Sequence, residues 1–330
     1  LITQRAGAAQ SVYVATAGTL ESLISSENKN LVEELTITGN LNFVDFEFIK
    51  TMSNLQLLDL SGLSNTTLPA SCLEGTTIPT VVLPWNLTAI PNRAFYQSGI
   101  TSIYIPETVQ TIGEYAFYQC QSIKGDLVIP DVTTSIGNYC FYSCSFDGAL
   151  IIGNGLQTIG EYAFASCSML TGDLVIPDSV TTIGKYAFYK CSGFTGNLMI
   201  GDGVVNIDNY AFQHCSGLSG NIVLGNKLAT IGVSAFEGCS SLVGNLVIPD
   251  SVTSLEYNAF LNCTSFQGYL LIGAGLTELP YGAFAALEDD SKLYTPLNFS
   301  AIYCKPSNLT LAYRPESMAG TERRYEGLAF

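Results

Sequence analysis

Charged residues are scarce in this 330-residue chain, because Asp, Glu, Lys and Arg together make up only 12% of it. Just 13 residues are Lys or Arg, whereas 28 are Asp or Glu, so the net charge is −15. A surface of this sign repels nucleic acid and anionic lipid, and we expect neither as a partner. Long apolar runs are also missing, since none reaches the roughly 18 to 20 residues of a membrane helix. We therefore expect that this chain does not insert into a membrane.

Motifs that carry catalysis or bind metals are absent as well. The chain has no P-loop, no hydrolase triad and no C-x-x-C pair. Its single histidine, His214, occupies a repeat position that holds Gln, Ser, Lys, Gly or Asn elsewhere. We therefore expect His214 to be exposed and not a catalytic base. The segment from Gly201 to Asp208 resembles a calcium loop only faintly, because its Gly pair recurs in other repeats as a turn. The sequence predicts neither an enzyme nor a cofactor or metal site.

The chain does contain an internal repeat. A Phe recurs at steps of 22 to 24 residues, and a Cys follows most of these Phe residues three positions later. The complete unit reads L-x-I-[PG]-x-x-V-x-x-I-G-x-Y-A-F-x-x-C-x-x-L-x-G-[DN], as in Leu174 to Asn197. Such a repeat predicts a solenoid, in which each coil buries its apolar side chains against its neighbours. The recurring residues are Phe95, Phe117, Phe141, Phe164, Phe188, Phe212, Phe236, Phe260 and Phe284.

Each unit predicts two short strands. Leu174 and Ile176 alternate with exposed positions, Ile183 marks the second strand, and Ile-Pro-Asp or Ile-Gly-x-Gly supplies the turn between the strands. We expect the Ala-Phe pair in a tight helical or 3₁₀ turn, with Phe filling the centre of the coil. The whole pattern predicts a β-rich, right-handed solenoid of about nine coils, which would extend about 40 Å between an N-terminal and a C-terminal cap.

We divide the chain into four parts. Residues 1–10 are expected to be a flexible leader or linker, and because they begin without Met we expect that an export signal has been removed. Residues 11–79 are expected to form an N-terminal cap that opens with a short helix near Leu20 to Ser25. Residues 80–286 form the solenoid, and residues 287–330 a C-terminal cap or tail. Basic residues in that last part either dock on the acidic body or are solvated: Lys292, Lys305, Arg314, Arg323 and Arg324.

Two segments carry a resemblance to a known family. IPDSVTTIGKYAFYKCSGF (176–194) and IPETVQTIGEYAFYQCQSI (105–123) resemble the BspA-like class of leucine-rich repeat. The resemblance covers about residues 80 to 286 and implies the α/β leucine-rich-repeat fold class. It also implies a secreted or cell-surface protein of a bacterium, because the family consists largely of such proteins, and its better-known members are similar to adhesins for host matrix proteins and other microbes. The family motif contains no catalytic residue.

The cysteine column is the first candidate for chemistry, since equivalent residues of a solenoid stack on one another. Its members lie about one coil apart without a partner His, and stacked Cβ atoms stand about 4.8 Å apart, farther than the roughly 3.8 Å that a disulfide prefers. We therefore expect buried, reduced, structural thiols. Cys140 and Cys144 are the one close pair for which a disulfide stays open. The column comprises Cys120, Cys144, Cys167, Cys191, Cys215, Cys239 and Cys263.

Two columns of tyrosines form a candidate ligand-binding surface. One column lies two positions before the repeat Phe, and the other lies one position after it. Because Phe points inward, the side chain directly after it should point outward. Tyrosine is amphipathic and enriched at recognition surfaces. The alternative is that these rings stack on one another as a ladder and shield the edge of the core. The residues are Tyr96, Tyr115, Tyr118, Tyr139, Tyr142, Tyr162, Tyr186, Tyr189 and Tyr210.

The middle residue of the first strand forms a second candidate surface. If Leu127 and Ile129 face inward, Val128 faces outward, and so does its whole column. An exposed apolar row suggests contact with a partner, a second copy or a flanking segment. Plain β-propensity is the competing explanation. The residues are Val128, Ile151, Val175, Met199, Val223, Val247 and Leu271.

The function that the sequence favours is non-enzymatic adhesion or interaction at the cell surface or outside the cell. The partner would be a host extracellular protein, a microbial surface protein or a glycan, bound through an extended face of the solenoid. Two alternatives stay open: a structural spacer that displays another domain, and a glycan-binding component of a nutrient-uptake system.

Overall fold

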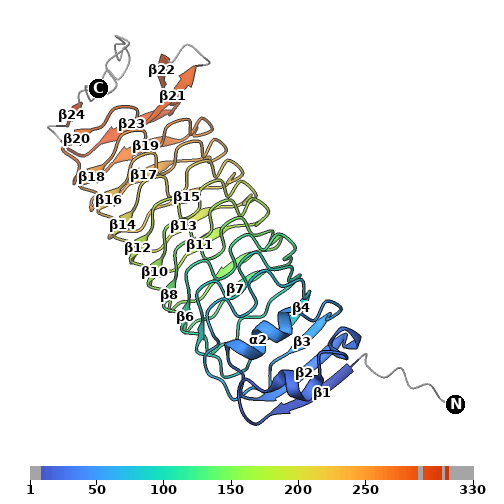
Figure 1. The fold of residues 1–330 in the computed structure, drawn as a ribbon. Coiled ribbons are helices and arrows are strands. Elements are labelled where there is room, and N and C mark those ends of the chain that lie inside the picture. Colours follow the sequence, from blue (N-terminus) through green and yellow to red (C-terminus); the bar gives the residue numbers. More distant parts are fainter. Residues whose placement is uncertain (1–8, 289–292, 307–308, 312–330) are drawn as a thin grey trace.

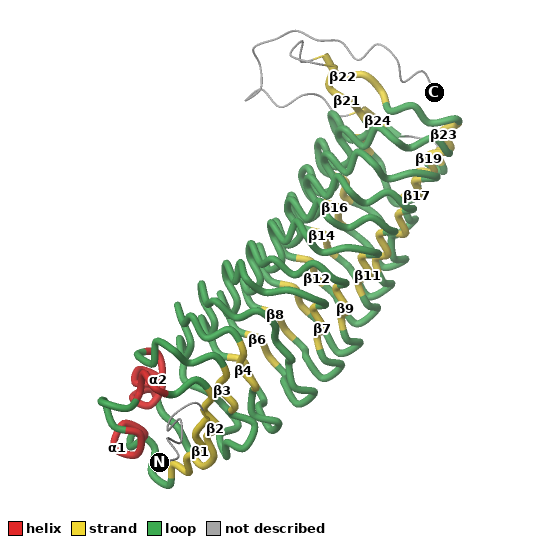
Figure 2. Tube along the Cα trace, turned by 90° about the vertical axis from the view of Figure 1, so that its right-hand side faces the viewer, coloured by secondary structure: helices red, strands yellow, loops and turns green. Residues whose placement is uncertain are grey.

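The computed structural model describes residues 9–288, 293–306 and 309–311. These residues form an elongated solenoid, with β1 (Ala9–Val14) at one end and β24 (Thr310–Leu311) at the other (Figure 1). Helices are found only at the N-terminal end of the described chain (Figure 2). Among the described residues, no helix has the length and apolar character required to cross a bilayer.

The N-terminal part stacks four parallel strands in the order of the sequence. After β1 these are β2 (Glu34–Gly39), β3 (Leu57–Asp59) and β4 (Thr80–Val82). The expected helix is α1 (Leu20–Ile24), followed by the short 3₁₀ helix η1 (Lys29–Leu31) and by α2 (Phe43–Lys50). Buried Asp45 joins the two α-helices: it closes the capping box of α2, and its carboxylate accepts hydrogen bonds from the N–H groups of Gly18 and Leu20 (2.6 and 3.0 Å).

The repeats then build two parallel ladders along the solenoid. Equivalent residues pair directly, as Leu174 does with Leu198, so each repeat is one turn. The first-strand ladder continues with β7 (Leu127–Ile129), β9 (Leu150–Ile152), β11 (Leu174–Ile176), β13 (Leu198–Ile200), β15 (Ile222–Val223), β17 (Leu246–Ile248) and β19 (Tyr269–Ile272). The second-strand ladder contains β5 (Ala89–Ile90), β6 (Thr111–Ile112), β8 (Ser135–Ile136), β10 (Thr158–Ile159), β12 (Thr182–Ile183), β14 (Asn206–Ile207), β16 (Thr230–Ile231), β18 (Ser254–Leu255) and β20 (Glu278–Leu279).

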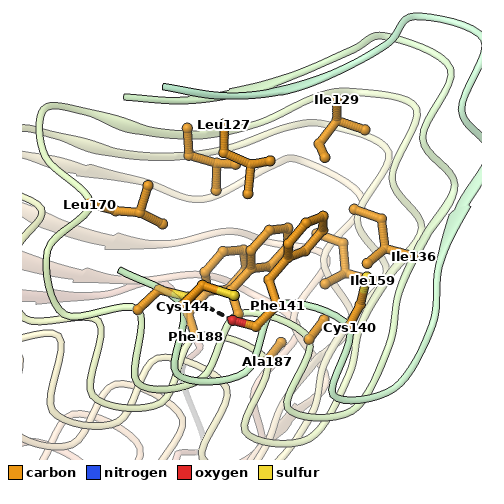
Figure 3. Packing of buried hydrophobic residues seen from close by; sticks show 14 of the residues in the cluster. Leu127, Ile129, Ile136, Cys140, Phe141, Cys144, Ile159, Leu170, Ala187 and Phe188 are labelled. Atoms are coloured by element: carbon orange, nitrogen blue, oxygen red, sulfur yellow. Dashed lines mark hydrogen bonds between the residues drawn. The ribbon is translucent and has the colours of Figure 1, made fainter. Parts of the chain in front are cut away.

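A continuous stack of phenylalanine rings fills the centre. Neighbouring rings lie nearly parallel with centroids 4.8 to 5.6 Å apart, from Phe95 to Phe284. Figure 3 shows rings of this stack between the inward-facing side chains of Leu127, Ile129 and Ile136. The prediction that Phe fills the coil centre is confirmed.

The turn that carries Phe is not the helical or 3₁₀ turn that we expected. Ala116, Tyr118 and Cys120 donate to carbonyls three residues back, as in a 3₁₀ helix. The N–H groups between them donate instead to the next coil, as Phe117 does to Cys140 O at 2.7 Å. Tyr115 and Gln119 adopt left-handed conformations (φ 56° and 54°). These conformations point alternate N–H groups toward the next coil and so prevent a helix.

The C-terminal part extends the solenoid by one more coil. β23 (Ala301–Cys304) pairs in parallel with β19, and β24 pairs with β20. An antiparallel hairpin of β21 (Ala285–Glu288) and β22 (Leu293–Pro296) is inserted before this coil. Lys305 docks on the body, because its ammonium group pairs with Asp250 at 2.8 Å. The other basic residues of the predicted tail, Lys292, Arg314, Arg323 and Arg324, lie outside the described residues.

The number of coils and two boundaries differ from the prediction. The solenoid has about 11 turns instead of nine, because both predicted caps contribute strands that stack in line with the repeats. β1 begins at Ala9, inside the segment 1–10 that we expected to be a flexible leader, because Ala9 already pairs with Glu34. Likewise β21 begins at Ala285, before the predicted end of the solenoid at residue 286.

Candidate binding surface

The middle residues of the first strands face solvent, as predicted. Five of the seven are exposed: Val128 by 44%, Ile151 by 50%, Val175 by 42%, Val223 by 55% and Val247 by 40%. Met199 and Leu271 are half-buried. The side chains of Leu127 and Ile129, on either side of Val128, are each only 1% exposed. The pleat of each strand therefore separates core from surface.

Aromatic residues extend this line at both ends. Tyr104 lies 13 positions before its repeat Phe, as Val128 does, and is 55% exposed. Tyr303 pairs with Leu271 in the parallel ladder and is 56% exposed. We define the apolar row as the seven predicted residues together with Tyr104 and Tyr303. Beyond it, the one tryptophan, Trp85, is 60% exposed, and its ring centroid lies 6.0 Å from that of Tyr104. The sequence analysis missed these aromatic ends.

Two polar columns border the apolar row. On one side, Asp and Asn side chains just before the first strand accept hydrogen bonds from the next coil, as Asn197 Oδ1 does from Asn221 N at 2.9 Å. On the other side, residues of the turn after the strand do the same, as Asp178 Oδ1 does from Asp202 N at 2.8 Å. Carboxylates occur in both columns, for example Asp173 and Asp250. The apolar row is therefore an exposed apolar strip with an acidic, polar margin.

The predicted tyrosines stack on one another, which is the alternative that the sequence left open. The column two before Phe is a continuous stack from Tyr115 to Tyr210, with centroids 4.5 to 5.0 Å apart. Tyr96, Tyr118 and Tyr142 form a second stack at 4.9 and 5.0 Å, and Tyr189 meets Tyr186 edge-on at 5.4 Å. All nine rings are half-buried. Ligand binding by these tyrosines stays a prediction.

Burial changes the acidity of the stacked tyrosines. Burial, together with the neighbouring tyrosines Tyr186 and Tyr139, raises the pKa of Tyr162 to about 12. The pKa values of Tyr118, Tyr139, Tyr186 and Tyr210 are also raised, chiefly by burial. These hydroxyl groups therefore stay protonated at neutral pH.

The cysteine column is buried, as predicted, and is part of the core. Each thiol donates to the carbonyl of a Phe in the preceding coil, for example Cys144 to Phe117 O at 2.9 Å and Cys191 to Phe164 O at 3.0 Å. Cys140 and Cys144 are both free and fully or almost fully buried. Burial raises the pKa of Cys140 and Cys144 well above the ordinary value, so these thiols are poor nucleophiles.

His214 is exposed, as predicted, and its ring lies 6.1 Å from that of Tyr189. In the described part of the chain, no group of three or more His, Cys, Asp or Glu residues could hold a metal ion. The geometry thus offers extended surfaces for contact, and the apolar row is one of them.

Comparison with known proteins identifies the repeat. The model described as BspA type leucine rich repeat region (6 copies) matches residues 25–124, 88–219, 134–267 and 192–303. These overlapping matches cover most of the chain. No curated protein shows a significant sequence match.

Several solved structures are similar to this chain. A leucine-rich repeat protein from Bacteroides ovatus shares 18% identity over 81% of this chain and 88% of its own, with a TM-score of 0.34. A leucine rich cell surface protein from Faecalibacterium prausnitzii shares 21% identity over 84% of this chain and 74% of its own, with a TM-score of 0.37. The pneumococcal vaccine antigen PcpA shares 15% identity over 86% of this chain and 80% of its own, with a TM-score of 0.34.

Proposed function

Because this chain belongs to the BspA-type leucine-rich repeat family, we propose that it is a non-enzymatic interaction module, secreted or displayed on the cell surface, that binds a partner protein through the apolar row. The observation that carries this proposal is the row of solvent-facing apolar side chains along the first-strand ladder, most of which are exposed. With nine members and a strand spacing of about 4.8 Å, the apolar row is about 40 Å long.

The shape and chemistry of the apolar row fit a protein partner better than a glycan. Its side chains, from Val128 to Leu271, are aliphatic and offer no hydrogen-bonding group to sugar hydroxyls. An apolar centre with a polar margin is the usual composition of protein interfaces, and exposed aromatic residues are frequent hot spots in them. Trp85 and Tyr104 at one end and Tyr303 at the other would serve as anchors.

The partner should carry basic residues around an apolar strip. The polar columns beside the apolar row hold carboxylates, including Asp126, Asp131 and Asp173, and the net charge of the chain is −15. Charges at the margin of an interface mainly accelerate association and select partners. We therefore propose adhesion to a host extracellular protein or a microbial surface protein with a basic margin.

The experiment compares two triple variants for capture of host extracellular-matrix proteins. Val175→Glu/Val223→Glu/Val247→Glu places charges in the apolar row, while Thr111→Glu/Ser135→Glu/Thr158→Glu places the same charges on the second-strand ladder. Proteins captured by the native chain are identified by mass spectrometry, purified and titrated. We expect the first variant to lose at least tenfold in affinity and the second to bind like the native chain.

Equal binding by both variants would exclude the apolar row as the interface. If the native chain captures nothing from matrix or from microbial surfaces, the solenoid acts as a spacer. Surface display is tested separately by protease treatment of intact cells, which should remove the protein before cytoplasmic markers are degraded.

A further inference from the structure

A polar groove lies on the second-strand ladder, away from the apolar row. Its volume is about 510 Å³, within the range of about 300 to 1,000 Å³ that is usual for small-molecule sites. Four successive coils contribute to it. The lining residues are Thr182, Asn206, Ile207, Asp208, Asn209, Thr230, Gly232, Val233 and Glu256.

The groove exists where two coils depart from the repeat. The position after the second strand holds Gly in five coils: Gly113, Gly137, Gly160, Gly184 and Gly232. A Cβ atom placed on Gly232 would lie only 2.6 Å from Asn209 N, so this position favours glycine. Asp208 and Glu256 nevertheless occupy it in the coils before and after Gly232. Two carboxylates therefore flank a gap that glycine leaves open, about 9.6 Å apart along the solenoid.

The two substitutions leave the backbone ladder intact. Asp208 N donates to Ile183 O at 3.0 Å, and Glu256 N donates to Ile231 O at 2.9 Å, as the glycines of this column do. The carboxylates are thus not required to complete the coil. Residues that break a local rule without a structural gain are frequently functional.

The groove offers an unused set of hydrogen-bonding groups. Within the residues that the structure describes, the side chains of Thr182, Asn206 and Thr230 have no hydrogen-bond partner. Asp208 and Glu256 each accept one bond, from Asn209 N and Ser254 Oγ respectively. Each carboxylate keeps a second oxygen for a ligand. Ile207 is fully buried and Val233 is only 9% exposed, so the accessible lining is almost entirely polar.

We propose that this groove binds a neutral saccharide. Carboxylate, amide and hydroxyl groups together can both accept from and donate to the adjacent hydroxyls of a sugar. No Lys, Arg or His lines the groove, so the two carboxylates repel acidic sugars such as sialic acid and uronates. This site is independent of the apolar row, and its ligand can be tested without the protein partner.

The test titrates the full chain with lactose, maltose, cellobiose and N,N′-diacetylchitobiose by isothermal calorimetry and saturation-transfer NMR. Sialyllactose, digalacturonate and hexalysine serve as charged probes. The variant Asp208→Gly/Glu256→Gly restores the residue that other coils hold, so we expect it to fold. Glu114→Gln/Glu161→Gln removes two carboxylates elsewhere on the solenoid and is the matched control. Circular dichroism and urea unfolding verify both folds, and Asp208→Asn/Glu256→Gln replaces the first variant if it does not fold.

We expect at least one neutral disaccharide to bind at millimolar concentration. The glycine variant should weaken this binding by tenfold or more, since bonds to charged groups are the strong ones in such a site, and the control should not change it. The proposal is overturned if no neutral disaccharide binds, if binding survives in the glycine variant, or if only the acidic sugars or hexalysine bind. None of these results depends on capture of a protein by the apolar row.

Discussion

At the scale of single residues, the tyrosine ladder is notable for its backbone. Tyr115, Tyr139, Tyr162, Tyr186 and Tyr210 all have φ between 53° and 61°, a left-handed conformation that is unfavourable for residues other than Gly and Asn. The same slot holds Asn258 and Gly282 in later coils. Ser234 holds the same conformation (φ 52°) without an aromatic ring, so the turn itself imposes it, and ring stacking offsets part of the strain in five successive coils.

Substitution of Tyr162 separates these two effects. Tyr162 stacks on Tyr139 and Tyr186 at 4.7 and 4.5 Å, and an aromatic pair contributes about 0.5 to 1.5 kcal/mol beyond its buried area. Tyr162→Asn relieves the backbone strain but removes both pairs, so we expect a net loss of about 1 to 2 kcal/mol in urea unfolding. Tyr162→Phe keeps the stack and should lose less than about 1 kcal/mol. A stabilising Tyr162→Asn would show that the ladder contributes little and is retained for binding.

The buried thiols predict sensitivity to alkali. Burial raises the pKa of Cys72 to about 12 and the pKa values of Cys140, Cys144, Cys191, Cys215 and Cys263 well above the ordinary value. The unfolded chain loses these protons above about pH 8.5, while the folded chain keeps them. The stability is therefore complete below that pH and falls above it, by up to about 1.4 kcal/mol per pH unit for each thiol. We expect unfolding before pH 11 in reducing buffer, measured by circular dichroism.

One conservative variant tests the cause of that transition. Ser98 occupies the cysteine slot in another coil and is buried, so Cys215→Ser should be tolerated. Serine can still donate to Phe188 O, as Cys215 does at 3.1 Å, but does not ionise in this range. The pH dependence of the unfolding free energy should become shallower by about 1.4 kcal/mol per pH unit. An unchanged slope would mean that Cys215 does not contribute to the alkaline unfolding.

At the scale of strands and turns, the close approach of coils depends on glycine at specific points. Gly203 lies in the Ile-Gly-x-Gly turn, and a Cβ atom there would overlap Asp178 O of the preceding coil. Because backbone and not a flexible side chain is in the way, we expect Gly203→Ala to destabilise the protein by about 2 to 3 kcal/mol.

The middle position of an equivalent turn in another coil provides the control for Gly203. Asn154 is the middle residue of an equivalent turn, where Ala274 stands in a later coil. Asn154→Ala should change the unfolding free energy by less than about 0.5 kcal/mol. If both variants unfold at the same urea concentration, coil contact at Gly203 is looser than the structure indicates.

The strands and the core could be predicted from the sequence, because alternation of apolar residues fixes which side chains face inward. The Phe turn could not, since its left-handed residues, such as Tyr115 and Gln119, are not the glycines that usually signal such a backbone. Tyr303 was missed because the hairpin β21–β22 lengthens the step from Tyr269 to its partner Ala301 and hides the 24-residue period. The groove was missed although its signal was present: Asp208 and Glu256 are the charged exceptions in a column of glycines.

At the scale of the whole molecule, each coil packs mainly on its two neighbours, so the solenoid should tolerate loss of a complete coil. Deletion of residues 198–221 removes one repeat and joins Asn197 to Ile222, which takes the place of Leu198 in the ladder because these two residues are paired partners. The protein should fold, shorten by about 4.8 Å in small-angle scattering, and show a urea m-value lower by about a tenth.

Deletion of residues 198–209 provides the contrasting case, because it removes half a coil. Both strands of that coil, β13 and β14, are lost, and Phe212 no longer meets the ring of Phe188, now 5.2 Å away. Every later coil would then have to stack across a coil that has lost both strands, and we expect no cooperative unfolding transition. If instead both deletions abolish folding, the solenoid is not a nearest-neighbour array, and the apolar row and the groove would have to be studied as parts of one indivisible core.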